Sequence, residues 1–197
     1  MQQLPQPVTR RGEATQRRLL EAAELEFGEK GFTRASVSSI TSRAGVGQGT
    51  FYNYFPSKEA VLRELVRHMG RALRRSLSSA TSGASNRIEV ERRGLEAFIS
   101  FSRNHQNLYR IVMESQFVDE AIYREYYERL AAGYTAALRA AQEDGDVTAG
   151  DAEAQGWALM GIAHFAGLRY GIWSDSAPDQ HVLETLHGLI RRGLEPV

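Results

Sequence analysis

Cysteine is absent from this 197-residue chain, so neither a disulfide framework nor a cysteine-ligated zinc site can form. No apolar run approaches the length of a membrane span, and the first residues, MQQLPQPVTRRGE, lack the apolar centre of a secretory signal. With 42% hydrophobic and 24% charged residues, the composition is that of a globular protein with a real core. We therefore expect a cytoplasmic protein that makes no membrane contact.

The formal net charge of the whole chain is zero, which at first argues against a nucleic-acid partner. The distribution of charge is uneven, however. Met1–Ser79 holds 13 basic and 7 acidic residues, a net charge of +6, whereas the remainder holds 11 and 17, a net charge of −6. A basic first part on an acidic body indicates that only the first part meets a polyanion, although ordinary surface variation is the alternative.

No stretch has a convincing strand pattern, and apolar residues recur at helical spacing along the chain. We predict an all-α fold of about nine helices. Beyond the central motif described next, the expected helices cover residues 14–30, 57–78, 88–104, 107–114, 119–142, 152–173 and 180–192.

The stretch from Phe32 to Lys58, FTRASVSSITSRAGVGQGTFYNYFPSK, predicts two short helices joined by a tight turn. Ser36 is a candidate N-cap for the first helix, and Gly45 stands where a helix closes with a positive φ. The second helix is expected from about Gly47 to Tyr54. A helix, a sharp turn and a second helix with polar outward residues are typical of a DNA-binding helix-turn-helix.

Several polar residues of this motif have the chemistry to contact DNA. Gln48 can address adenine, Thr50 a phosphate or a thymine methyl, and Asn53 a base or a phosphate, while the Tyr52 hydroxyl can donate to a phosphate. The alternative is that these residues only solubilise a surface. The predicted DNA-contacting set is Ser36, Ser38, Arg43, Gln48, Gly49, Thr50, Tyr52, Asn53 and Lys58.

Other motifs do not indicate enzymatic chemistry. The glycine-rich Gly45–Gly49 lacks the buried strand that a nucleotide-binding loop requires, and the acidic residues from Asp144 to Asp151 lack the glycine and closing glutamate of an EF-hand. The five histidines are scattered, and no nucleophile stands at a recognisable spacing from a base. We expect no catalytic residue, metal or cofactor. The least favoured alternative is an all-α enzyme that uses a cavity lined by the aromatic residues of the second part of the chain.

LLEAAELEFGEKGF followed by SVSSITSRAGVGQGTFYNYFPSKEAVL resembles, nearly position for position, the N-terminal domain of the tetracycline-repressor (TetR) family of bacterial regulators. The similarity covers about the first third of the chain. Three positions depart from the family pattern: Gly47 replaces a small hydroxyl residue, Thr41 stands where alanine is common, and Glu26 takes a place that is usually apolar. The resemblance implies phosphate contacts from Tyr52 and Lys58.

The resemblance also implies a helical second domain with a pocket for a small-molecule effector, and the aromatic residues there are candidates for its lining. The predicted ligand-binding set is Met113, Phe117, Tyr127, Trp157, Met160, His164 and Phe165. His164 is alternatively a core or interface group. The segment RNHQNLYRIVMESQFVDEAIYREYYERL is similar to regulators of acyl-CoA or aromatic-acid metabolism, which makes these compounds candidate effectors.

Small residues in the last two helices, Gly156, Gly161, Ala163 and Gly167, predict close helix approach in a homodimer. The expected organisation is a flexible arm (1–13), a DNA-binding domain (14–56), a linking helix (57–79) and a ligand-binding and dimerisation domain (80–197). We expect a repressor that an apolar or amphipathic ligand releases from its double-stranded DNA operator. The alternative is a ligand-binding or scaffolding module without specific DNA activity.

Overall fold

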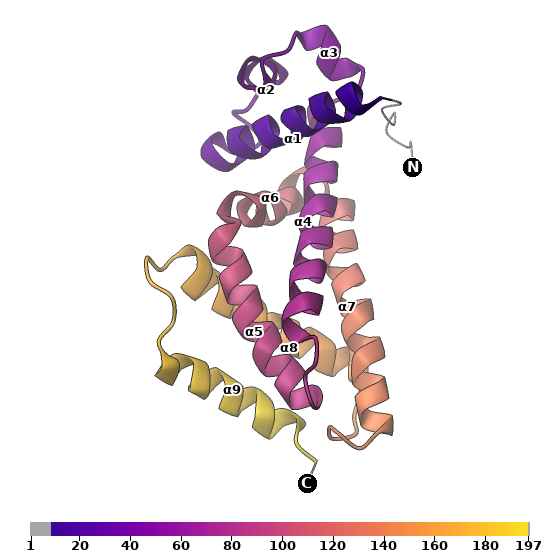
Figure 1. Cartoon of the computed structure of the whole chain (residues 1–197), viewed down its shortest axis with the longest axis vertical. Coiled ribbons are helices and arrows are strands. Elements are labelled where there is room, and N and C mark those ends of the chain that lie inside the picture. The colour runs from indigo at the N-terminus through magenta and orange to yellow at the C-terminus, as the bar shows by residue number, and fades with distance from the viewer. Residues whose placement is uncertain (1–8, 197) are drawn as a thin grey trace. The chain divides into compact units, whose positions relative to one another are not determined.

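The computed structural model describes residues 9–196, and all regular elements among them are helices (Figure 1). In chain order these are α1 (Arg10–Lys30), α2 (Val37–Ala44), α3 (Gln48–Tyr52), α4 (Lys58–Thr81), α5 (Arg87–Asn104), α6 (Gln106–Val118), α7 (Glu120–Glu143), α8 (Ala152–Ala166), the π-helix η1 (Gly167–Ile172) and α9 (Gln180–Leu194). The all-α prediction is confirmed. Within this range, no helix is long and apolar enough to cross a membrane.

The chain forms two compact units, and the division falls inside helices. The first unit holds the chain up to Met69 together with Asn107–Tyr126, and the second holds Gly70–Gln106 and the chain from Tyr127 onward. α4 and α7 each contribute to both units. The domain boundary expected between residues 79 and 80 falls inside the second unit, since this unit already begins at Gly70 of α4.

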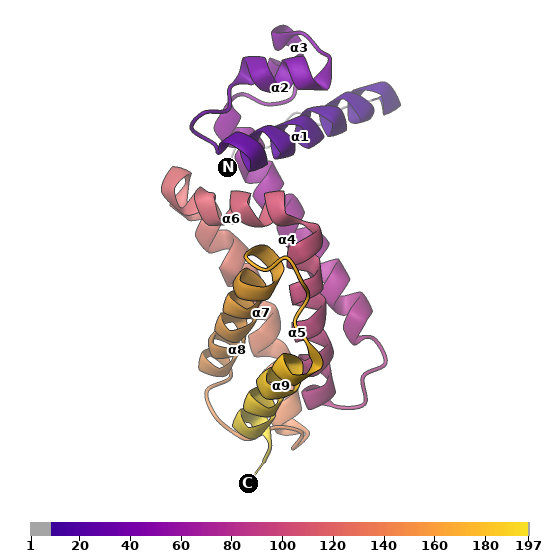
Figure 2. The same cartoon turned by 90° about the vertical axis from the view of Figure 1, so that its left-hand side faces the viewer.

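The first unit is built around aromatic side chains from consecutive helices. In both views α2 and α3 lie on the same side of α1 (Figures 1 and 2). Phe27 from α1 and Phe51 from α3 are fully buried, and Phe32 packs its ring 5.3 Å from that of Phe27. Burial of side chains of this size stabilises the fold by about 1.5–3 kcal/mol each.

The first helix starts earlier than its apolar pattern predicts. Thr9 is its N-cap, and the Thr9 hydroxyl accepts a hydrogen bond of 3.1 Å from the Gly12 amide. Residues 10–13, expected to belong to a flexible arm, are therefore helical, which corrects that part of the prediction. The remainder of the expected arm, residues 1–8, lies outside the described residues.

The second unit packs α5, α7, α8 and α9 around an apolar cluster of its own. Its fully or nearly fully buried members include Leu95, Ile99, Leu138, Leu159, Ile190 and Leu194. The helix expected over residues 152–173 changes to π geometry after Ala166. Gly167 and Gly171 lie against α5 here: a Cβ on Gly167 would stand 2.5 Å from Phe98 Cε1, and one on Gly171 2.7 Å from Ser102 Cβ. Only glycine allows this approach without a shift of α5.

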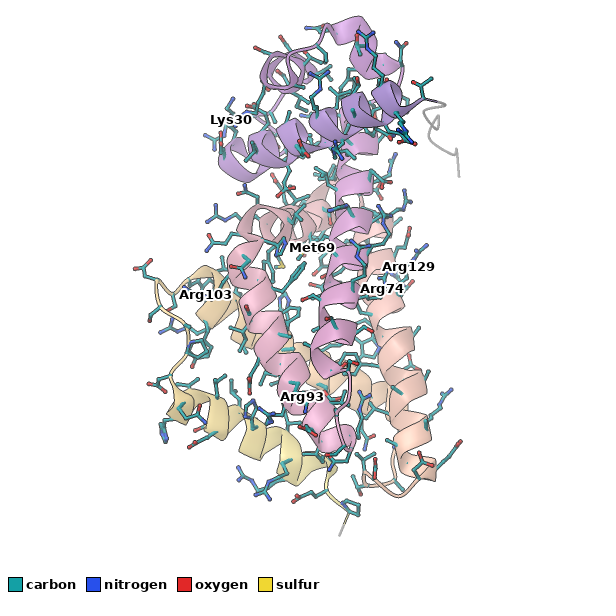
Figure 3. The ribbon with its side chains drawn as sticks, viewed as in Figure 1. Lys30, Met69, Arg74, Arg93, Arg103 and Arg129 are labelled. Carbon is teal, nitrogen blue, oxygen red and sulfur yellow. The ribbon has the colours of Figure 1, made fainter. Side chains whose placement is uncertain are left out.

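Arg103 of α5 holds the chain that leaves the π-helix (Figure 3). Its guanidinium donates to the backbone carbonyls of Tyr170 at 2.9 Å, Ser174 at 3.1 Å, Asp175 at 3.0 Å and Ser176 at 2.9 Å. Carbonyls at the end of a helix lack intrahelical partners, and Arg103 supplies a donor to four of them here. The Ser176 carbonyl also accepts from the Ser174 hydroxyl at 2.9 Å. The path from η1 to α9 is set by α5.

Candidate nucleic-acid interface

The α2–α3 pair has the geometry of a helix-turn-helix. Ser36 and Ser39 form a reciprocal capping box at the start of α2, and Gly45 ends α2 in the left-handed region with φ 65° and ψ 39°. Both the predicted N-cap and the predicted positive φ are confirmed. The turn is closed by the Val46 amide, which donates to the Thr41 carbonyl at 3.0 Å. Gly47 then precedes α3 and provides no side-chain cap.

The third helix turns one side toward the core and leaves its polar side in solvent. Phe51 is fully buried, whereas Gln48 and Asn53 are exposed and Tyr52 is 56% exposed. The Tyr52 ring packs edge-on against Phe51 with centroids 5.4 Å apart, which limits the directions that its hydroxyl can take. Gly49 is also exposed and Thr50 is half-buried. This polar side is accessible to a partner, as the predicted DNA contacts require; the contacts themselves stay predictions.

Two residues that depart from the family pattern have structural roles in the first unit. Thr41 is buried, and its hydroxyl donates to the Ser38 carbonyl at 3.1 Å, so the extra polar atom is satisfied. Glu26 is only 2% exposed and receives Lys30 Nζ at 2.7 Å and Arg43 Nε at 2.7 Å. The hydrogen bond from Lys30, helped by those from Ser39 and Arg43, lowers the pKa of Glu26 to about 2.

Arg43 is bound by carboxylates of its own chain, which the sequence did not indicate. Besides Glu26, its two terminal nitrogens donate to the carboxylate of Glu29 at 3.0 and 2.6 Å. Glu29 and then Glu26 raise the pKa of Arg43. All three guanidinium nitrogens thus bind carboxylates of α1. Two of the five guanidinium N–H groups remain after these three bonds, and the predicted phosphate contact depends on them. The exposed Ser36 and Ser38 also keep their predicted role.

Lys58, the other predicted phosphate ligand, fixes the loop between α1 and α2. Its Nζ donates to the carbonyls of Phe32 at 2.7 Å and Ala35 at 2.8 Å and lies 4.2 Å from the centre of the Phe32 ring. An ammonium has three N–H groups, and one remains after these two bonds. The predicted phosphate contact therefore depends on that third donor. The Ser57 hydroxyl, just before α4, accepts a hydrogen bond from the Ala60 amide at 3.3 Å.

Glu114 of α6 binds the same loop and was missed by sequence reasoning. Both of its carboxylate oxygens lie 2.9 Å from the Phe32 amide nitrogen, which donates to them. The partners are 82 residues apart, so no local pattern marks the contact. Glu114 and Lys58 together hold the amide and carbonyl groups of one loop, and through it the start of α2.

The predicted ligand-binding residues separate into exposed and buried groups. Phe117 is 84% exposed, Phe165 is 69% exposed and Trp157 is also exposed, so these three do not line an enclosed cavity within the described chain, which corrects their predicted place. Two polar members of the predicted set, from α7 and α8, do meet: Tyr127 Oη lies 3.4 Å from His164 Nδ1. Burial lowers the pKa of His164.

Two members of the predicted set remain. Met160 is buried in the second unit, on the same helix as His164, and Met113 is half-buried in the first unit. The residues that line the pocket were predicted from the aromatic content of this part of the chain. Aromatic content does not distinguish a side chain that faces inward from one that faces solvent. A lining that includes Tyr127, Met160 and His164 stays a prediction.

Four large apolar side chains on or next to α8, η1 and α9 are exposed and are here together called the α8–α9 surface: Trp157, Phe165, Trp173 and Leu189. Trp157, Gly161 and Phe165 recur every four residues on one side of α8, and no atom lies within 4 Å of a Cβ built on Gly161. Gly156 and Gly167, by contrast, approach Tyr134 and Phe98 of the same chain. Small residues therefore serve internal packing at two positions where close contact with a partner was predicted.

Comparisons with known proteins agree with this geometry. Residues 19–65 match the sequence profile described as bacterial regulatory proteins, tetR family. The chain is 48% identical over 56 residues to the uncharacterized HTH-type transcriptional regulator YdgC of Bacillus subtilis, covering 28% of this chain and 29% of that protein. It is 32% identical over 135 residues to the HTH-type transcriptional regulator EthR of Mycolicibacterium smegmatis, covering 64% and 55%. These alignments span less than two thirds of either relative.

The fold of the whole chain is similar to that of a solved regulator. The fatty acid degradation regulator FadR from Bacillus halodurans superposes with a TM-score of 0.76 at 21% identity, covering 89% of this chain and 94% of that one. At this identity the likeness establishes the fold alone.

Proposed function

Because this chain belongs to the TetR family of bacterial regulatory proteins, we propose that it is a homodimeric transcriptional regulator that binds a double-stranded DNA operator through α3. The observation that carries the proposal is the two-sided character of this helix: Phe51 is fully buried while Gln48, Tyr52 and Asn53 remain in solvent. Amide and hydroxyl groups on an accessible helix have the chemistry to bind base edges and phosphates.

The basic charge of the first 79 residues supports this choice of partner. Their net charge is +6, against −6 for the rest of the chain. Phosphate neutralisation supplies much of the affinity for DNA and makes it depend on salt. A single five-residue helix contacts few base pairs, so we propose that two chains bind two halves of a roughly palindromic operator.

The α8–α9 surface is the proposed dimer contact. Exposed aromatic side chains such as Phe165 and Trp173, which are 69% and 68% exposed, are the residue types that dominate protein interfaces. The domain division at residues 56 and 79 is retained here as a functional proposal: DNA binding, linkage through α4, then ligand binding and dimerisation.

We further propose that the protein is a repressor and that a small apolar or amphipathic ligand releases it by shifting α4. α4 starts at Lys58, which holds the loop ahead of α2. Further along α4, Arg63 pairs with Asp119, just before α7, and Arg67 pairs with Glu125 of α7. A displacement of α4 would therefore strain the support of the helix-turn-helix. A coupling free energy of about 1–3 kcal/mol is typical for such transitions. We propose an acyl derivative as the effector class, in keeping with the fatty acid degradation regulator that shares this fold, and an aromatic acid as the alternative.

The test is binding of the full chain to the DNA upstream of its own gene, measured by fluorescence anisotropy against a shuffled duplex at several salt concentrations. Gln48→Ala and Tyr52→Phe should each weaken specific binding by about tenfold, since a good base contact contributes about 1–3 kcal/mol. Gln180→Ala, an exposed glutamine at the start of α9, is the matched control and should bind as wild type does. Equal affinity of wild type for both duplexes would instead favour a ligand-binding or scaffolding module.

A further inference from the structure

The helix α8 continues without a break into the π-helix η1, which carries the chain to Trp173. Ala166, with φ −63° and ψ −43°, and Gly167, with φ −61° and ψ −42°, both keep right-handed helical angles. The Trp173 amide then donates to the Leu168 carbonyl at 3.0 Å, which is the i→i+5 pattern of a π-helix. A π-turn is rare and frequently stands at a functional site. This one ends at a residue of the α8–α9 surface.

The π-turn changes the direction in which Trp173 points. An uninterrupted α-helix turns by about 100° per residue, so it would place Trp173 about 160° around the axis from Trp157. A π-turn holds roughly one residue more than an α-turn, which reverses about 100° of that rotation. Trp173 then lies about 60° from Trp157, close to Phe165 at about 80°. The π-turn therefore aligns three exposed aromatic side chains along one side of α8 and η1.

Close packing against α5 supports the π geometry. A Cβ on Gly171 would stand 3.2 Å from the Ile99 carbonyl oxygen and 3.4 Å from the Arg103 amide nitrogen, in addition to its approach to Ser102. Two of these neighbours are backbone atoms, which cannot turn away as the end of a flexible side chain can. The end of η1 is therefore fixed on α5, directly beside Arg103.

Arg103 holds the backbone on both sides of Trp173 (Figure 3). Its guanidinium donates to one carbonyl before Trp173 and to three after it, those of Tyr170, Ser174, Asp175 and Ser176. A guanidinium is planar and presents five donors in a fixed fork, so it fixes the relative positions of the carbonyls that it binds. The Trp173 side chain is 68% exposed, so its direction is set mainly by this backbone.

We propose that Arg103 and the π-turn of η1 are positioning elements of the contact between two subunits. They hold Trp173 in line with Trp157 and Phe165, and Arg103 thereby sets the affinity of the dimer. A side chain that is already oriented loses less conformational freedom on association. The inference rests on the proposed dimer contact through the α8–α9 surface and goes beyond it, because Arg103 lies on α5 and acts through Trp173.

The test measures the dissociation constant of the dimer by sedimentation equilibrium of the full chain. Arg103→Gln should weaken self-association about tenfold, because ordering of Trp173 would then oppose association. Arg103→Lys keeps the charge but offers three donors from one atom, so it should recover only part of the affinity. Arg110→Gln removes an exposed charge from α6 and, as the control, should change the dissociation constant less than about twofold.

A double-mutant cycle separates the positioning of Trp173 from a general effect on the fold. Trp173→Ser alone should weaken self-association roughly thirtyfold. If Arg103 acts through Trp173, adding Arg103→Gln to Trp173→Ser should cost only about twofold more, whereas independent effects would multiply to about 300-fold. Circular dichroism checks that each variant is folded. Arg103→Lys takes the place of Arg103→Gln in the cycle if the glutamine variant does not fold.

Two results would overturn the proposal while leaving the dimer contact intact. One is wild-type affinity in Arg103→Gln together with a loss in Trp173→Ser, which would show that Trp173 keeps its place without Arg103. The other is a multiplied loss in the double variant, which would show that Arg103 acts elsewhere. A monomeric wild type, or an unchanged dissociation constant in Trp173→Ser, would refute the proposed dimer contact and this inference with it. That outcome is recognised without any change at Arg103.

Discussion

The two units of this protein each bury a glutamate, and the two carboxyl groups respond to burial in opposite ways. In the first unit, Glu26 receives hydrogen bonds from Lys30, Ser39 and Arg43, and its pKa falls to about 2. In the second unit, Glu91 is 4% exposed and pairs with Arg87, yet burial raises its pKa. The balance between burial and hydrogen bonding decides the sign: hydrogen bonds outweigh the loss of water around Glu26, whereas burial outweighs the bonds from Arg87 and Tyr134 at Glu91.

The same contrast extends to what the units present to solvent. The first unit uses its internal charges, from Glu26, Lys58 and Glu114, to hold loops and helices beneath an exposed polar helix. The second unit exposes aromatic side chains such as Phe165 and Trp173. A polar surface that binds through hydrogen bonds needs a rigid support to keep its donors and acceptors in place. An apolar surface instead gains free energy of association in proportion to the area that it buries. The two surfaces therefore suit different partners.

The largest expected effect is on the free energy of unfolding, and it compares a buried with an exposed phenylalanine of the first unit. Phe51→Ala should lower the free energy of unfolding by about 3–5 kcal/mol, because it leaves a cavity under α3. Phe117→Ala makes the same change at an 84% exposed position and should stay within about 0.5 kcal/mol of wild type. Urea unfolding followed by circular dichroism measures both. Similar losses in the two variants would show that the core of this unit does not depend on Phe51.

A slightly smaller effect is expected at the apolar surface of the second unit. Phe165→Ser and Trp173→Ser should each weaken self-association by about 2 kcal/mol, roughly thirtyfold, if these residues are central to the dimer contact. Sedimentation equilibrium gives the dissociation constant. Phe117→Ser removes an equally exposed aromatic from the first unit and should leave it unchanged. If only the Phe117 variant dissociates, the α8–α9 surface is not the dimer contact.

Glu114→Ala tests the support of the helix-turn-helix. The loss of both acceptors leaves the Phe32 amide unpaired and should destabilise the protein by about 1–3 kcal/mol. Glu114→Gln keeps one acceptor oxygen and should recover part of that loss. Glu120→Ala, at an exposed position of the same unit, serves as the control. Thermal unfolding detects the change; a loss as large in Glu120→Ala would count against a specific role for Glu114.

The smallest effect is the opposite pH dependence of the two glutamates. Glu26 has a lowered pKa, so its contribution is present above pH 4.5 and is lost as the pH falls toward about 2. Glu91 has a raised pKa, so the free energy of unfolding falls as the pH rises past 4.5.

Denaturant unfolding between about pH 3 and about pH 7 separates these contributions. Relative to wild type, Glu26→Gln should become less stable as the pH rises, and Glu91→Gln should become more stable. If the stability of both variants changed with pH in the same direction, the pKa values of Glu26 and Glu91 would not be shifted in opposite directions.

Local sequence signals anticipated much of the first unit. The capping serine at position 36, the left-handed Gly45 and the burial of Phe51 beside exposed Gln48 all follow from residues within one or two helical turns of each other. The position of Arg43 did not follow, since its availability depends on carboxylates 14 and 17 residues away on another helix. Lys58 was anticipated as a polar ligand, but its two carbonyl partners were not.

In the second unit the helices were anticipated more reliably than the direction of their side chains. The aromatic content predicted a lined pocket, yet Phe165 and Trp157 face solvent, because an almost wholly apolar helix such as α8 has no polar side to set its rotation. The π-helical turn at Gly167 was not anticipated either. It accompanies close packing of Gly167 and Gly171 against α5, and its continuation is held by Arg103 from the same helix.

By itself, the sequence determined the all-helical class, the capped helix-turn-helix and the outward polar side of α3, because each depends on backbone preferences and spacings within a few residues. Only the tertiary structure decided which charged groups pair with others in the same chain, that Glu114 accepts from the Phe32 amide, and which aromatic side chains remain in solvent. Those outcomes depend on desolvation and on partners distant in the chain, and neither quantity is encoded in any short stretch of residues.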